Sequence, residues 1–157
     1  LSLRLFSRLD EAEFKTVDLY EGIDSTLLIL QHRLKATAQR PEIEVIENRA
    51  VLPRIECYPG QLNQVFMNIL ANAIDAVEEA HDRGLCPQPS IQISSEQIGD
   101  RAIICISDNG IGIPDEIHHQ TCRQRNRDGS VGLLPNCHRK TSWNATLSFF
   151  ARTRYDV

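Results

Sequence analysis

Residues 61–80, QLNQVFMNILANAIDAVEEA, predict one long amphipathic helix. At about 100° per residue, its apolar side chains fall within one broad arc that is wide enough to pack on a core. These side chains are Leu62, Val65, Phe66, Ile69, Leu70, Ala73 and Val77. The helix is therefore expected to form one layer of the fold, with a sheet beneath it.

A second, narrower face of this helix carries Gln64, Asn68, Asn72 and Asp75. Asn is a poor helix former because its amide competes for backbone hydrogen bonds, so helix stability does not explain the row. Two interpretations remain at this point. The row is either an ordinary solvated face or a set of amides and a carboxylate that binds a ligand or a hydrated metal.

The other segments predict a two-layer α/β sandwich. A helix over residues 20–38 ends before Pro41, and Gly99-Asp100 forms a turn between the last two predicted strands. Strands are predicted at 16–19, 42–47, 54–57, 91–97 and 101–107. The order β-α-β-β-α-β-β favours helices on one face of a mixed, mostly antiparallel sheet. Residues 1–14 have helical spacing and are typical of the end of a longer helix.

Length and composition are those of one globular domain. The chain has 157 residues, of which 41% are hydrophobic and 24% charged. No apolar run approaches the roughly 20 residues of a membrane span, and Arg4 and Arg8 interrupt any signal-peptide pattern. Five Cys without paired spacing favour a reduced, cytoplasmic setting. The start at Leu1 suggests a fragment or an internal start.

The strand over 101–107 runs directly into Asp108-Asn109-Gly110-Ile111-Gly112-Ile113-Pro114. An apolar strand that ends in an Asp and a Gly-x-Gly turn brings a buried carboxylate next to bare backbone. A flat ligand with an exocyclic amine would donate a hydrogen bond to Asp108. Taken alone, the pattern is also typical of an ordinary turn.

Together, the two motifs resemble a known nucleotide-binding superfamily. The Asn-Ile-Leu-Ala-Asn-Ala-Ile-Asp-Ala helix is similar to the asparagine box, and Asp-Asn-Gly-Ile-Gly-Ile to the first glycine box, of sensor histidine kinases, type II topoisomerases, heat-shock chaperones and mismatch-repair ATPases. The likeness covers residues 16–117 and implies the Bergerat fold of this GHKL superfamily.

The resemblance implies a role for each residue of the two boxes. Asn72 would ligate the Mg²⁺ that bridges the ATP phosphates, with Asn68 lining the same site. Asp75 would contact phosphates or water, and Asp108 would accept from the adenine amino group. The backbone at Gly110 and Gly112 would approach the base, and Ile111 or Ile113 would form a wall beside it.

Within the superfamily, the start of the chain resembles a sensor histidine kinase. Residues 1–15 look like the end of a dimerisation helix and a linker, which implies a homodimer in the full-length protein, a response regulator as partner and no specific nucleic acid. The topoisomerase branch is disfavoured because its catalytic Glu has no acidic counterpart over 61–67. His32 and His81 lack the context of a phosphoacceptor, which we expect upstream of this chain.

After residue 117 the pattern breaks. Residues 1–117 carry a net charge of −9 and residues 118–157 one of +5, which together give −4. The Phe-rich box is missing, and Pro135 obstructs a helix after the glycines near 128–134. Only 145–150 keeps a strand-like run. We interpret 118–157 as a divergent tail that replaces the lid and the second glycine box, or as sequence read out of frame.

The tail offers one further set of residues. His118, His119, Cys122, Cys137 and His138 are zinc-ligand types in a non-standard spacing.

The resemblance to sensor histidine kinases implies an ATP-binding kinase module, impaired by its tail, that uses ATP and Mg²⁺ and phosphorylates a histidine on a separate dimerisation domain. The alternative is a degenerate, non-catalytic regulator that binds a nucleotide or docks on a partner.

Overall fold

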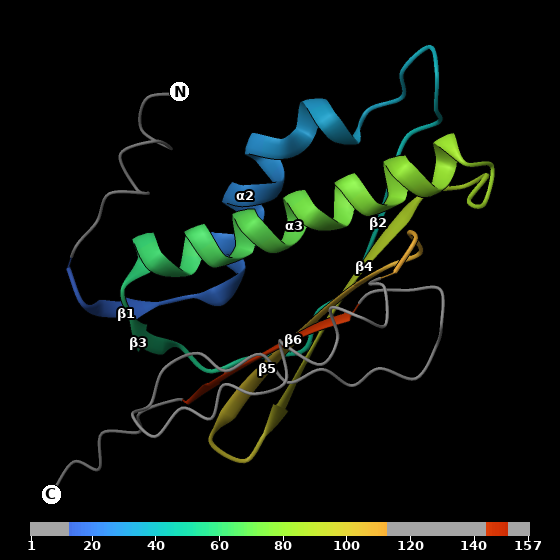
Figure 1. Cartoon of the computed structure of the whole chain (residues 1–157). Helices are drawn as coiled ribbons and strands as arrows, with labels where there is room; N and C mark the ends of the chain where they lie inside the picture. The colour runs from blue at the N-terminus through green and yellow to red at the C-terminus, as the bar shows by residue number, and fades with distance from the viewer. Residues whose placement is uncertain (1–12, 113–143, 151–157) are drawn as a thin grey trace, which may run out of the picture.

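The computed structural model of the chain describes residues 13–112 and 144–150. Their elements follow one another as β1 (Lys15–Val17), α2 (Leu19–Leu34), β2 (Glu44–Asn48), β3 (Ile55–Cys57), α3 (Pro59–Asp82), β4 (Ser90–Ile98), β5 (Arg101–Asp108) and β6 (Asn144–Phe150). A four-stranded sheet has the order β2-β4-β5-β6, with β2 parallel to β4 and the other pairs antiparallel. Both helices lie on one side of this sheet (Figure 1), so the predicted two-layer fold is confirmed.

Strands β1 and β3 do not join the larger sheet. They pair antiparallel with each other, with Thr16 opposite Glu56, and lie beside the N-terminal end of α3 (Figure 1). Each strand has only three residues. Such short segments show no periodicity from which their partner strand follows, so the sequence did not predict this separate pair.

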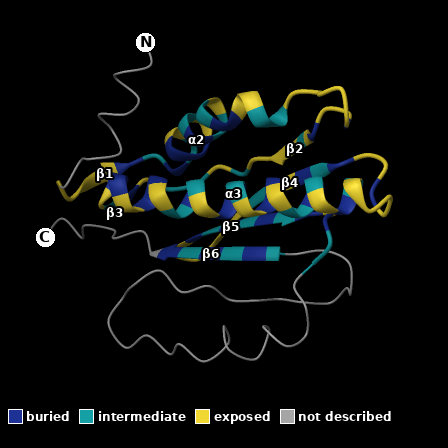
Figure 2. Cartoon of the chain, turned by 45° about the horizontal axis from the view of Figure 1, so that its top comes forward, coloured by how far each residue is buried: buried dark blue, intermediate teal, exposed yellow. Residues whose placement is uncertain are grey.

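The core lies between α3 and the sheet. Of the apolar side chains predicted to face it from α3, all but the half-buried Val65 are buried. In β5, burial alternates along the strand, and Ile104 and Ile106 are fully enclosed. In Figure 2, buried dark-blue and exposed yellow segments alternate along α3. Burying each side chain of this size stabilises the fold by about 1.5–3 kcal/mol relative to leaving it exposed. This packing fixes α3 over β5 and thereby positions the site.

Strand β6 comes from the segment interpreted as a divergent tail. It pairs antiparallel along almost the whole of β5, from Arg101 opposite Phe150 to Ser107 opposite Asn144. Its inward-facing residues are buried, and the ring of Phe149 lies 6.5 Å from that of Phe66 in α3. Residues 144–150 are therefore part of the same core as the preceding strands.

Helix α2 ends at Leu34, four residues before the predicted end at 38. The side chain of Arg40 supplies the reason. Its side chain is only 7% exposed, and its guanidinium group donates to the backbone carbonyls of Arg33, Lys35 and Pro41. The last carbonyls of a helix have no partner within the helix, so these hydrogen bonds stabilise an early end.

Candidate functional site

The polar row of α3 is exposed along its length. Pro59 begins the helix where its missing N–H costs nothing, and the 24-residue helix then holds Gln64, Asn68, Asn72 and Asp75 on the surface. The amide of Gln64 donates to Asn68 Oδ1 at 2.9 Å. Among the described residues, the Asn72 side chain has no hydrogen-bond partner. Its amide is thus accessible to a ligand, on the same face as Asn68.

Asp75 forms an ion pair with Arg33 of the neighbouring helix α2. Its Oδ1 lies 2.6 Å from Arg33 Nη2, and the same nitrogen lies 2.6 Å from Glu78 Oε2. Arg40 holds the other carboxylate oxygen of Glu78 at 2.8 Å. Partial burial lowers the pKa of Arg33, but hydrogen bonds to both carboxylates outweigh this and raise the pKa above its usual value. The sequence analysis predicted Asp75 but missed these two arginines.

Asp108 is the last residue of β5 and is only 4% exposed. Its Oδ1 accepts a hydrogen bond from the Gly110 N–H at 2.8 Å. The next residue, Asn109, anchors the turn to the loop before β4, because its side chain accepts from Ser90 N and donates to Gln88 O, both at 2.8 Å. The predicted buried carboxylate is therefore present, and Asn109 is a positioning residue that the sequence analysis treated only as part of a turn.

Gly110 lies against α3. A Cβ at this position would be 2.5 Å from the carbonyl carbon of Ala76 and 2.6 Å from its oxygen, which is closer than any side chain tolerates. The Ile111 N–H donates to that oxygen at 3.3 Å. Gly112 has a φ of +73°, which favours glycine. The missing side chain of Gly110 thus permits contact with the helix; approach to a base stays a prediction.

These contacts bring the two motifs together. Ala76 follows Asp75 directly, so the turn that contains Asp108 packs against α3 one helical turn beyond Asn72. Figure 1 shows this turn beside the C-terminal half of α3. Along the helix axis, Asn72 and Asn68 lie about 6 and 12 Å from Ala76, at 1.5 Å per residue. Of the residues predicted for the nucleotide site, only Ile113 lies outside the described ranges.

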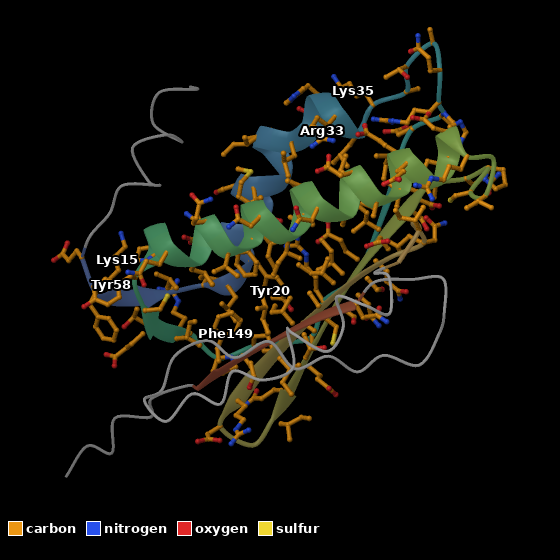
Figure 3. The ribbon with its side chains drawn as sticks, in the orientation of Figure 1. Lys15, Tyr20, Arg33, Lys35, Tyr58 and Phe149 are labelled. Carbon is orange, nitrogen blue, oxygen red and sulfur yellow. The ribbon has the colours of Figure 1, made fainter. Side chains whose placement is uncertain are left out.

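A pocket of about 110 Å³ lies elsewhere, between β1 and the first turns of α2 and α3. Lys15 and Asn63 line it, and none of the predicted site residues does. Lys15 and Tyr58 mark this end of the molecule in Figure 3, opposite the Asp108 turn. We identify the candidate site by its hydrogen-bond donors and acceptors rather than by this pocket.

The described residues contain no cluster of three or more His, Cys, Asp or Glu placed to bind a metal. A metal at α3 would accordingly be held by amide oxygens and by groups that a ligand brings. Mg²⁺ fits such a donor set, since it prefers oxygen and retains several waters. The zinc-type residues His118, His119, Cys122, Cys137 and His138 lie outside the described ranges. Neither helix described is long and apolar enough to span a membrane.

Histidine kinases are among the curated proteins similar to this chain. Over 85 residues the chain is 32% identical to the circadian input-output histidine kinase CikA of Synechococcus elongatus, which covers 52% of this chain and 10% of that protein. Over 95 residues it is 33% identical to the sensor histidine kinase ZraS of Salmonella typhimurium, which covers 57% and 19%. The chain therefore spans a fifth or less of the length of these two relatives.

Solved structures share its fold. The catalytic domain of histidine kinase ThkA superposes with a TM-score of 0.63 at 17% identity, over 88% of this chain and 96% of that domain. ThkA in complex with the response regulator TrrA gives 0.64 at 16%, over 95% and 48%. The family model described as histidine kinase-, DNA gyrase B-, and HSP90-like ATPase matches residues 57–152. The chain belongs to this ATPase family and has the fold of a histidine kinase catalytic domain.

Proposed function

We propose that the chain is the ATP-binding catalytic module of a two-component sensor histidine kinase. In this role it presents ATP to a histidine on a separate dimerisation domain, in a cytoplasmic setting. The observation that carries the proposal is the placement of Asp108, nearly fully buried at the end of β5 and held against α3 one helical turn beyond Asn72.

Asp108 is the adenine-recognising residue in this proposal. A carboxylate accepts hydrogen bonds but does not donate them, so it suits the exocyclic amino group of adenine and disfavours the carbonyl oxygen that guanine has in that place. Because Asp108 is buried, its hydrogen bond to a base is stronger than one made in water. The hydrogen bond from the Gly110 N–H holds the carboxylate in place before a ligand binds, and the hydrogen bond between Asn109 and Ser90 fixes the turn.

Asn72 and Asn68 face the phosphates in this arrangement. An extended nucleotide whose base contacts Asp108 reaches the 6–12 Å along α3 that separate the turn from the two amides. The Asn72 oxygen, with Asn68 beside it, would hold Mg²⁺, which neutralises phosphate charge when bound. Catalysis in phosphoryl transfer consists mostly of positioning and charge neutralisation, and the residues of α3 supply the positioning.

In the proposed function, neither of the two described histidines is the phosphate acceptor. His32 lies on the exposed face of α2, with Nδ1 3.2 Å from the Ile29 carbonyl of its own helix. His81 stands at the end of α3, with Nδ1 2.8 Å from the Cys86 carbonyl. In the proposed function, a separate dimerisation domain supplies the acceptor histidine, and the phosphoryl group passes from it to a response regulator. The complex of ThkA with a response regulator supports this choice of partner.

Titration with a fluorescent ATP analogue, with and without Mg²⁺, tests the proposal. We expect saturable binding that Mg²⁺ tightens, and loss of the Mg²⁺ effect in Asn72→Ala. Gln61→Ala is the matched control, since Gln61 is exposed on the first turn of the same helix and lies about 16 Å from Asn72 along the helix axis. Absence of saturable binding by the unmodified chain would contradict the proposal and favour a regulator that docks on a partner.

Phosphotransfer is measured separately. The chain is mixed with radiolabelled ATP and the dimerisation domain of a related kinase, and acid-labile phosphohistidine is followed. Binding without transfer would restrict the function to nucleotide binding.

A further inference from the structure

Asp75 places a negative charge beside the region assigned to the phosphates. It lies three residues after Asn72 on the same helix, which puts the two Cβ atoms about 5–6 Å apart. Its side chain is 64% exposed, so the charge is not enclosed by protein. ATP carries several negative charges, and a carboxylate without a compensating cation at this distance opposes their binding.

The compensating cation is Arg33. Its Nη2 contacts both Asp75 and Glu78 at 2.6 Å, and its side chain is 28% exposed. In Figure 3, Arg33 lies at the end of α2, above α3. The guanidinium group is thus held between the two helices and next to the polar row.

Arg40 neutralises the second carboxylate of this cluster, that of Glu78. Its Nε and Nη2 donate to Glu78 Oε1 at 3.2 and 2.8 Å, while its remaining donors bind backbone carbonyls. Two guanidinium groups therefore face two carboxylates, and the four charges cancel. Because Arg40 already neutralises Glu78, the charge of Arg33 is available to Asp75. Loss of Arg33 alone leaves one net negative charge next to Asn72.

We propose that Arg33 is a positioning residue for the triphosphate: it neutralises Asp75 and thereby permits the phosphates of ATP to bind over Asn72. This inference rests on the proposed function, because it requires ATP to bind at α3. It assigns a role to an α2 residue that neither nucleotide motif contains. It also gives Asp75 an electrostatic partner in place of a direct contact with phosphate.

The test compares Arg33→Gln, Asp75→Asn and the double variant in the full chain. Each is titrated with ATP and with adenosine, by displacement of a fluorescent nucleotide. A unit charge about 6–8 Å away, between protein and water, changes an affinity by roughly three- to tenfold. Arg49→Gln is the matched control, since Arg49 also pairs with two carboxylates, Asp24 and Glu47, and is 35% exposed.

We expect Arg33→Gln to weaken ATP by about three- to tenfold at low salt and adenosine by less than about twofold, because only ATP carries charge at this position. The double variant regains most of the lost affinity, and Arg49→Gln has no effect. The inference is overturned if ATP affinity is unchanged in Arg33→Gln, if adenosine weakens equally, or if the double variant stays weak. Failure of the unmodified chain to bind ATP would instead overturn the proposed function, and this inference with it.

Discussion

Replacement of Gly110 by Ala tests how the glycine-containing turn is held against α3. The added Cβ would lie 2.5–2.7 Å from the carbonyl carbon, oxygen and Cβ of Ala76. Because these are mostly helix backbone atoms, no side-chain rotation relieves the overlap, and the turn must move. Overpacking of this kind costs about 1–3 kcal/mol. Loss of the hydrogen bond from Ile111 N to Ala76 O adds about 0.5–1.5 kcal/mol.

The expected destabilisation is thus about 1.5–4.5 kcal/mol, which corresponds to a fall in melting temperature of roughly 3–18 °C at about 2–4 °C per kcal/mol for a chain of this size. Affinity for a fluorescent ATP analogue should fall as well, since the Gly110 N–H binds Asp108 Oδ1. Circular dichroism and fluorescence titration measure the two effects. Gly99→Ala is the control: with φ at +60° and nothing within 4 Å, it loses stability through backbone strain but keeps its affinity. A Gly110→Ala variant with unchanged melting and affinity would refute this reasoning.

Three further variants or conditions test the packing and the buried groups. Arg40→Met should lose about 2–4 kcal/mol in urea unfolding, because helix carbonyls lose their partner; a loss below about 0.5 kcal/mol would contradict this. Phe66→Ala should lose about 3–5 kcal/mol through the cavity that it leaves, against less than about 1 kcal/mol for the half-exposed Phe14→Ala. Burial raises the pKa of Cys57 and of Cys86 above the usual value of about 9. The contribution of these two thiols to stability should therefore be constant below pH ~9 and fall as the pH rises through the raised values, and Cys86→Ala should reduce this fall.

The strongly periodic segments could be predicted from the sequence. The apolar arc of α3 and the alternation in β5 each repeat over several turns or residue pairs, and burial follows them closely. The exposed row of Asn68 and Asn72 and the burial of Asp108 follow from the same patterns. Their roles toward ATP and Mg²⁺ stay predictions.

Contacts between distant segments could not be predicted. Arg33 and Asp75 are 42 residues apart in the sequence. They meet only because helices α2 and α3 pack together at a particular crossing angle and distance. The contact of Gly110 with Ala76 likewise depends on how α3 sits above the end of β5. The early end of α2 depends on Arg40, which lies beyond the helix and bonds back to it. Sequence periodicity carries no information about such crossings.

The most direct measurement of the central claim is competition between ATP and GTP for the chain and for Asp108→Asn. The account predicts that ATP displaces a fluorescent nucleotide and that GTP does so at least tenfold more weakly, because a carboxylate does not donate to the guanine carbonyl. In Asp108→Asn, ATP affinity should fall at least tenfold, while Asp100→Asn in the exposed turn after β4 behaves like the unmodified chain. Equal binding of ATP and GTP, or an Asp108→Asn variant that binds ATP as before, would contradict the claim that Asp108 recognises adenine.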